Sequence, residues 1–149
     1  MTRRCGLTRR EPPRVETMIT VEGLTKVYGN TVSVDNVSFQ AKPGRVTGFL
    51  GPNGAGKSTC MRMMTGLTPP TRGHATILGK DYSKLDNPGR HVGVLLDASA
   101  QHVGRTGHEV LTIGAKTMGL PADRVTEILD VVGLTPAEAK RRVGDYSLG

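Results

Sequence analysis

The stretch of residues 51–59 constrains the fold of this chain more than any other part of the sequence. It reads Gly-Pro-Asn-Gly-Ala-Gly-Lys-Ser-Thr, which fits the Walker A pattern of a glycine, four variable residues, a second glycine and Lys-Ser/Thr. Glycines let the backbone turn tightly and approach an anion, so that successive N–H groups can point at phosphate oxygens. We expect Lys57 to reach the terminal phosphates and the Ser58 hydroxyl to ligate Mg²⁺.

A loop of this kind lies between a buried strand and the front of a helix. Residues 45–50 predict the strand, and a helix is predicted to begin near Lys57 and to end near Gly66. The helix N-terminus adds a partial charge of about +0.5 to the phosphate site. Strand, loop and helix therefore follow one another in the required order.

Segments around the loop predict further β structure. Residues 19–28 predict a first strand, which a turn at Gly29 and Asn30 joins to a second β segment over residues 32–39. Residues 74–78 predict another strand. The nearly continuous apolar run of residues 92–96, which Asp97 follows, is typical of a buried strand.

The part of the chain after Asp97 predicts helices. Two segments fit the capping box, in which a threonine caps a helix and a glutamate three positions later reaches back. The first helix should run to about Met118, and a second should open at Pro121 and stop at Gly133. The capping pairs are Thr106 with Glu109 and Thr135 with Glu138, and the apolar face of the second helix comprises Val125, Ile128, Leu129 and Val132.

Composition limits the possible functions. A chain of 149 residues is long enough for a domain with a real core, and its net charge of +7 suits nucleic acid, an anionic membrane face or a polyphosphate. Three tyrosines and two phenylalanines offer little stacking surface, so no nucleic-acid partner is expected. The two cysteines suggest no disulfide framework, which favours a reducing cytosol, and no apolar run is long enough to span a bilayer.

Residues 1–17 differ from the rest of the chain. They carry five arginines and a Pro-Pro pair without periodicity, which predicts a disordered basic tail. A basic arm that grips lipid or nucleic acid is an alternative, and Met18 is a second candidate for the true start. The expected organisation is this tail, a β-rich part over residues 18–97 and a helical part over residues 98–149.

Taken together, these motifs resemble the amino-terminal part of an ABC transporter ATPase subunit, over residues 18–149. The segment Lys26-Val27-Tyr28-Gly29 is similar to the family motif whose aromatic ring stacks on adenine. A tyrosine that caps a strand end is the alternative for Tyr28. The resemblance implies that ATP is bound by Tyr28, Asn53, Gly54, Ala55, Gly56, Lys57, Ser58 and Thr59.

Asp97 departs from the family pattern. Most members have glutamine at this position, which contacts Mg²⁺ and the attacking water, whereas an acidic residue resembles drug- and antibiotic-export ATPases of the bacitracin-resistance type. Aspartate can still meet Mg²⁺, directly or through water, so Ser58 and Asp97 are the candidate metal ligands. Gln101 is a fallback for the missing glutamine, and a turn residue is the alternative for Asp97.

Residues 146–149 resemble the start of the family signature, in which Ser147 and Gly149 match. The resemblance implies that this segment binds the γ-phosphate of ATP held by the opposite subunit. The second acidic motif with its catalytic glutamate and the switch histidine are not found in the sequence. We therefore expect a C-terminally truncated copy, with no complete catalytic set and little or no ATP hydrolysis by itself.

The fold implied by the resemblance is α/β, a P-loop NTPase of ABC type with a β-rich subdomain, a partial core sheet and a helical subdomain. The implied function is ATP binding and hydrolysis coupled to membrane transport, with export as the expected direction and with Mg²⁺ and ATP as cofactors. Transmembrane permease subunits and a second ATPase subunit in a head-to-tail dimer are the expected partners, on the cytoplasmic face of the cell membrane.

Two other functions fit parts of the sequence. A compact P-loop kinase or NTPase would use Asp97, after the apolar run of residues 92–96, as its Mg²⁺-binding acid. A non-enzymatic basic module would use the charge of +7 on nucleic acid, but it leaves the phosphate loop unexplained.

Overall fold

The computed structural model describes residues 18–97 and 100–147, and the chain divides between Leu85 and Asp86 into two units with separate cores. This division precedes the boundary that the sequence suggested after Asp97. The predicted basic tail, residues 1–17, lies outside the described residues. Each unit is described by itself.

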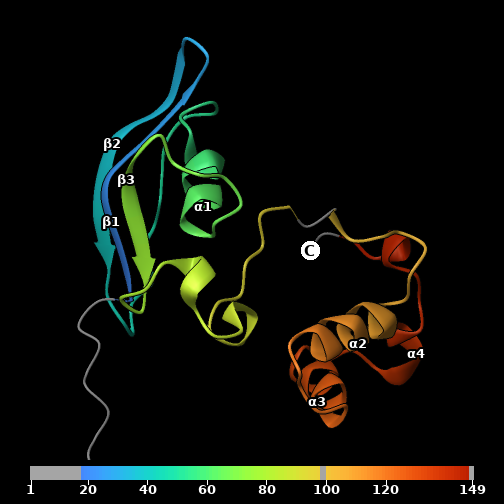
Figure 1. Ribbon diagram of the computed structural model, residues 1–149. Coiled ribbons are helices and arrows are strands. Elements are labelled where there is room, and N and C mark those ends of the chain that lie inside the picture. The colour runs from blue at the N-terminus through green and yellow to red at the C-terminus, as the bar shows by residue number, and fades with distance from the viewer. Residues whose placement is uncertain (1–17, 98–99, 148–149) are drawn as a thin grey trace, which may run out of the picture. The chain divides into compact units, whose positions relative to one another are not determined.

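The first unit contains an antiparallel sheet of three strands in the order β2-β1-β3. Strand β1 (Ile19–Tyr28) and strand β2 (Thr31–Ala41) form a hairpin, and strand β3 (Arg72–Ile77) pairs with the other edge of β1. The hairpin turns at Gly29 and Asn30, where Tyr28 lies opposite Thr31. The predicted hairpin is confirmed, and Figure 1 shows β1 and β2 side by side along the first unit.

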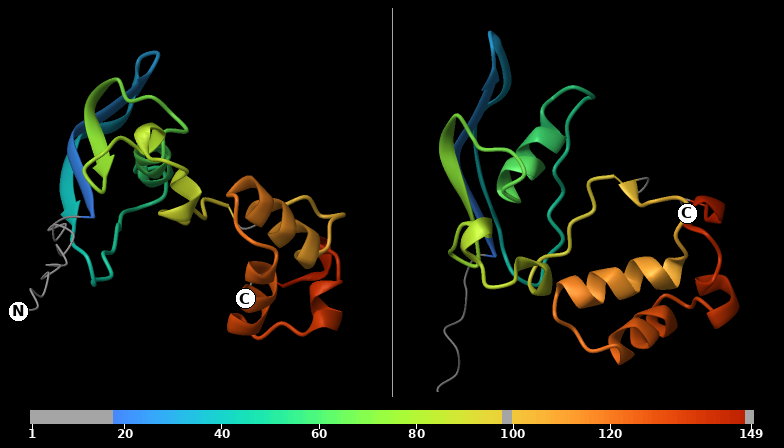
Figure 2. Two further views of the ribbon diagram at one scale, coloured as in Figure 1. Left: turned by 60° about the horizontal axis from the view of Figure 1, so that its bottom comes forward. Right: turned by 45° about the vertical axis from the view of Figure 1, so that its right-hand side comes forward.

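Helix α1 (Lys57–Met64) packs on one face of this sheet (Figures 1 and 2). Cys60 and Met63, one turn apart, point at the sheet, and burial raises the pKa of the Cys60 thiol. The helix ends at Met64, and Gly66, the residue after its C-cap Thr65, has a φ of 70°, the left-handed conformation of a Schellman motif. The buried core of the unit consists of Val21, Leu24, Val34, Cys60 and Met63.

The two strands predicted at residues 45–50 and 92–96 are absent from the structure, and both predictions are wrong. Val46 and Leu50 are almost completely exposed, and Leu95 is 79% exposed. A strand exists only through hydrogen bonds to a neighbouring strand, and in the described part of the chain neither segment pairs with one. An apolar sequence cannot supply that partner by itself.

The second unit is helical, as predicted. Its helices are α2 (Gly107–Thr117), α3 (Asp123–Val131) and the short α4 (Pro136–Ala139). The first residue of α3 lies after Pro121 rather than at it, and Val132 is 59% exposed, which corrects its predicted place on the apolar face. The buried core consists of Ala115, Val125, Leu129 and Ala139.

Both predicted capping boxes are present in this unit. Thr106 Oγ1 accepts a hydrogen bond from the Glu109 amide at 3.2 Å, and the Thr106 amide donates to the Glu109 carboxylate at 2.8 Å. Thr135 and Glu138 make the same pair of bonds at 3.3 and 2.8 Å. Hydrogen bonds from these threonines favour the ionised carboxylates and lower the pKa of both glutamates.

Candidate phosphate-binding site

The loop before α1 encloses a pocket of about 390 Å³ in the first unit. Its lining includes residues 53–59, which are all the loop residues that the sequence analysis predicted to contact the nucleotide. Ser33 of β2 is the one further lining residue. The loop therefore gathers its side chains and amides around one space, against the sheet.

Two glycines give the loop its shape. Gly54 and Gly56 have φ angles of 82° and 80°, a conformation that residues with a Cβ rarely adopt. A Cβ at position 56 would lie 2.1 Å from the Ser33 carbonyl oxygen, which is far inside van der Waals contact. Only glycine fits between the loop and β2 at this point.

Gly56 is also the N-cap residue of α1, and no side chain caps this helix. The first amides of a helix have no partner within it, so they seek a side chain, water or an anion. Here they belong to residues that line the pocket. The front of α1 is therefore suited to an anionic ligand.

Lys57 is held at the loop by two backbone carbonyls. Its Nζ donates to the carbonyl oxygen of Gly51 at 2.6 Å and to that of Pro52 at 2.7 Å. These bonds keep the ammonium beside the pocket that the same residue lines. A positive group in this place complements the amides of α1.

Three hydroxyl groups lie around the pocket. Ser58 is exposed and Thr59 is partly buried, and the Ser33 hydroxyl donates to Thr59 Oγ1 at 3.2 Å. The sequence did not single out Ser33, because nothing local distinguishes it from the other polar residues of β2. Its place depends on how the strand lies against α1.

Tyr28 is the last residue of β1 and lies outside the lining of this pocket. Its ring is half exposed, with Lys26 Nζ 4.9 Å from the ring centroid. The hairpin tip and the loop before α1 lie at the same end of the unit (Figures 1 and 2). The half-exposed Tyr28 therefore lies at the end of the unit that carries the pocket.

The remaining candidate residues belong to the second unit. Asp97 follows the irregular segment of residues 92–96, Gln101 lies at the start of the next loop, and Ser147 follows the 3₁₀ turn of residues 143–145. Gly149 lies outside the described residues. The site described from the geometry therefore consists of first-unit residues.

Residues 18–97 and 100–147 lack two features that bear on function. No three His, Cys, Asp or Glu side chains are grouped so that they could hold a metal ion. No helix there combines the length and the apolar character needed to cross a membrane.

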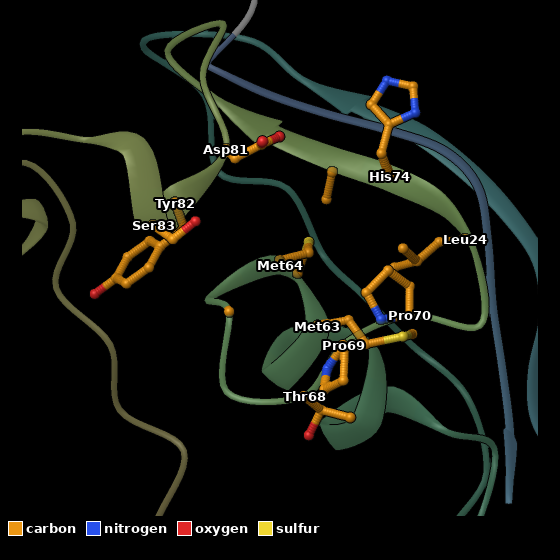
Figure 3. Close-up of a pocket in the computed structure, with 12 residues that line it drawn as sticks. Leu24, Met63, Met64, Thr68, Pro69, Pro70, His74, Asp81, Tyr82 and Ser83 are labelled. Carbon is orange, nitrogen blue, oxygen red and sulfur yellow. The ribbon is translucent and has the colours of Figure 1, made fainter.

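A second pocket of the first unit, about 330 Å³, lies between the end of α1 and the residues that follow β3 (Figure 3). Leu24, Met63 and Met64 form its apolar wall, and Asp81 and Tyr82 lie at its other side. Lys84 bonds to Asp81 and lowers the pKa of that carboxyl. Neither lysine nor arginine lines this pocket, so it suits a phosphate less well than the loop before α1.

Known proteins resemble this chain in sequence and in fold. The family described as ABC transporter matches residues 34–149. The chain is 39% identical to the bacitracin transport ATP-binding protein BcrA of Bacillus licheniformis over 91% of its length. It is 33% identical to the methionine import ATP-binding protein MetN of Geobacillus kaustophilus over 81% of its length.

A solved nucleotide-free ATP-binding cassette of an ABC transporter superposes on 88% of the chain, with a TM-score of 0.70 and 25% identity. The chain spans 44% of the length of the bacitracin relative, 39% of the methionine relative and 59% of the solved cassette. The similarity thus extends over most of this chain and over about half of each longer protein.

Proposed function

The chain belongs to the ABC transporter family, and from this premise we propose that it forms the ATP-binding part of a transport ATPase subunit. The observation that supports this proposal best is the pocket at the front of α1. Glycines with positive φ, uncapped helix amides and a lysine ammonium converge there, a combination suited to a polyphosphate. The family's fold accounts for the strand hairpin, the loop and the helical unit.

Each loop residue has a proposed role toward ATP. The amides of Gly54, Ala55 and Gly56 and those that open α1 bind phosphate oxygens, with Asn53 at the mouth of the loop. The Lys57 ammonium exchanges its bonds to the loop carbonyls for bonds to the terminal phosphates. Thr59 adds a hydroxyl at the side of the pocket nearest to β2.

Mg²⁺ fits the donor set of the pocket only in part. The exposed Ser58 hydroxyl supplies one hard oxygen ligand, and phosphate oxygens of the nucleotide are the natural remainder. Asp97, the acidic candidate of the sequence, remains a proposed metal ligand of the whole protein. Tyr28 is proposed to stack on the adenine ring, and its half-exposed position at the loop end of the unit supports this role.

For the whole protein, we propose ATP binding and hydrolysis coupled to transport. Its proposed partners are transmembrane permease subunits and a second ATPase subunit in a head-to-tail dimer, in which Ser147 and Gly149 contact ATP of the opposite subunit. Its proposed location is the cytoplasmic face of the cell membrane. Export is the proposed direction, because Asp97 resembles export ATPases and the bacitracin relative is more similar than the methionine import relative.

The alternative of a compact P-loop kinase has no comparable support. It required residues 92–96 as a strand that delivers Asp97 to Mg²⁺, and that segment is not a strand in the structure.

The test is nucleotide affinity. Lys57→Ala removes the ammonium, and we expect it to weaken binding of a fluorescent ATP analogue by about tenfold or more, as a charged hydrogen-bonding group does. Lys80→Ala removes an exposed lysine of the same unit outside the pocket and serves as the matched control. Wild-type affinity in a folded Lys57→Ala protein would refute the proposal.

A further inference from the structure

We propose that Ser33 is a positioning residue for the bound nucleotide and acts through the hydroxyl of Thr59; this inference rests on the proposed ATP-binding function. Ser33 lies on β2 and reaches the phosphate loop from the sheet. Its role would be to orient one hydroxyl of the loop toward the ligand.

The argument begins with the hydrogen bond between the two side chains. The Ser33 hydroxyl donates to Thr59 Oγ1 at 3.2 Å, and the bond is partly buried. A hydroxyl has one proton to donate and can accept at its lone pairs. When Thr59 accepts from Ser33, its own proton is directed to another acceptor.

The acceptor that the pocket favours is an anionic oxygen. Both Ser33 and Thr59 line the same pocket, together with the amides and the ammonium described above. A hydrogen bond to a charged oxygen is shorter and stronger than one between neutral groups, and a chain of hydroxyls strengthens it further. Ser33, Thr59 and a phosphate oxygen would form such a chain.

The backbone of Ser33 is held in place beside the loop. The Ser33 carbonyl lies against Gly56, and the next residue, Val34, is buried in the core with 4% exposure. The Ser33 backbone is therefore held by its contact with Gly56 and by the buried residue that follows it. Replacing the side chain leaves this backbone contact in place, so the contribution of the hydroxyl can be measured separately.

A double-mutant cycle on the 149-residue chain tests the proposal, with a fluorescent ATP analogue as the probe. We expect Ser33→Ala to weaken binding about three- to tenfold, which is the effect of one hydrogen bond. In a Thr59→Val background the same substitution should have no further effect. Ser33→Thr keeps a hydroxyl, suits a strand and should restore affinity to within about twofold of wild type.

Ser38→Ala is the matched control, because Ser38 also lies on β2 and its hydroxyl accepts a hydrogen bond from the Gly23 amide at 2.9 Å, outside the pocket. It should lower the melting temperature without changing nucleotide affinity. If Ser33→Ala fails to fold, Ser33→Cys replaces it, with a weaker donor of similar size and an expected loss of affinity in the same direction.

The outcomes separate this inference from the function on which it rests. Unchanged affinity in Ser33→Ala, or losses that simply add in the double variant with Thr59→Val, would overturn the role of Ser33. A loss in Lys57→Ala with no loss in Ser33→Ala would refute the positioning role and retain ATP binding. Unchanged affinity in Lys57→Ala would reject ATP binding at this loop itself.

Discussion

At the scale of single residues, Gly56 shows how backbone conformation and packing act at the same position. Its φ of 80° disfavours a side chain, and the Ser33 carbonyl occupies the place where a Cβ would stand. Either effect would favour glycine, and together they connect the loop to β2. The loop shape therefore depends on the strand below it as well as on its own glycines.

We expect Gly56→Ala to destabilise the first unit by about 1–3 kcal/mol and to weaken nucleotide binding, because the loop must move away from β2. Gly44→Ala is the control: its φ is 70°, but an added Cβ would meet nothing within 4 Å. Thermal unfolding and nucleotide titration of both variants check the prediction. Equal losses in the two variants would mean that the contact with Ser33 has no effect.

At the scale of elements, α2 and α4 of the second unit each begin at a threonine that caps the helix. Thr106 and Thr135 each satisfy an amide of the first turn, and the glutamate three positions later satisfies the amide of the threonine. These bonds join residues close in sequence, so they form in any setting that permits a helix. The same bonds connect helix stability to the charge of two carboxyls.

The lowered pKa values of Glu109 and Glu138 predict a loss of stability in acid. A carboxyl with a lower pKa in the folded state contributes stability above its unfolded pKa, and this contribution disappears as the pH falls through the folded value. We expect Glu109→Gln with Glu138→Gln, which keeps the accepting oxygens, to flatten the acid side of a plot of melting temperature against pH.

Asp130→Asn controls for the loss of a carboxyl elsewhere in the same unit, because Asp130 belongs to neither capping box. This control should keep the wild-type slope between neutral and acid pH. An equally steep slope in the double glutamine variant would show that the capping carboxylates do not govern acid stability.

At the scale of the whole molecule, each unit has its own buried cluster. The first cluster consists of residues from the sheet and from α1, and the second consists of residues from three helices. Leu24 is completely buried in the first cluster, where strand β1 lies in the middle of the sheet. Such a residue fixes the packing on which the loop and β2 depend.

Leu24→Ala should reduce the stability of the first unit by about 2–5 kcal/mol, because it removes buried methyl groups and leaves a cavity. Hydrogen exchange of the β1 amides measures this loss directly. Val32→Ala, at an exposed position of the same sheet, should change exchange far less. Similar exchange rates in the two variants would show that the buried Leu24 side chain contributes no more to stability than the exposed Val32.

Features that depend on neighbours in the chain could be predicted from the sequence alone. The phosphate loop, the helix after it, the β1–β2 hairpin and both capping boxes are all present in the structure. Their bonds close over short distances, through glycine conformations, turns and helix caps. The amino-acid order is therefore sufficient to specify them.

Features that depend on distant partners were decided by the tertiary structure. Residues 45–50 and 92–96 have the composition of strands, but a strand needs hydrogen bonds from another segment, and the described residues offer neither of them one. Ser33 lines the pocket because β2 lies beneath the loop. Its hydrogen bond to Thr59 joins two residues that are 26 positions apart in the sequence. Local sequence determined the loop itself, and packing across the sheet decided what surrounds it.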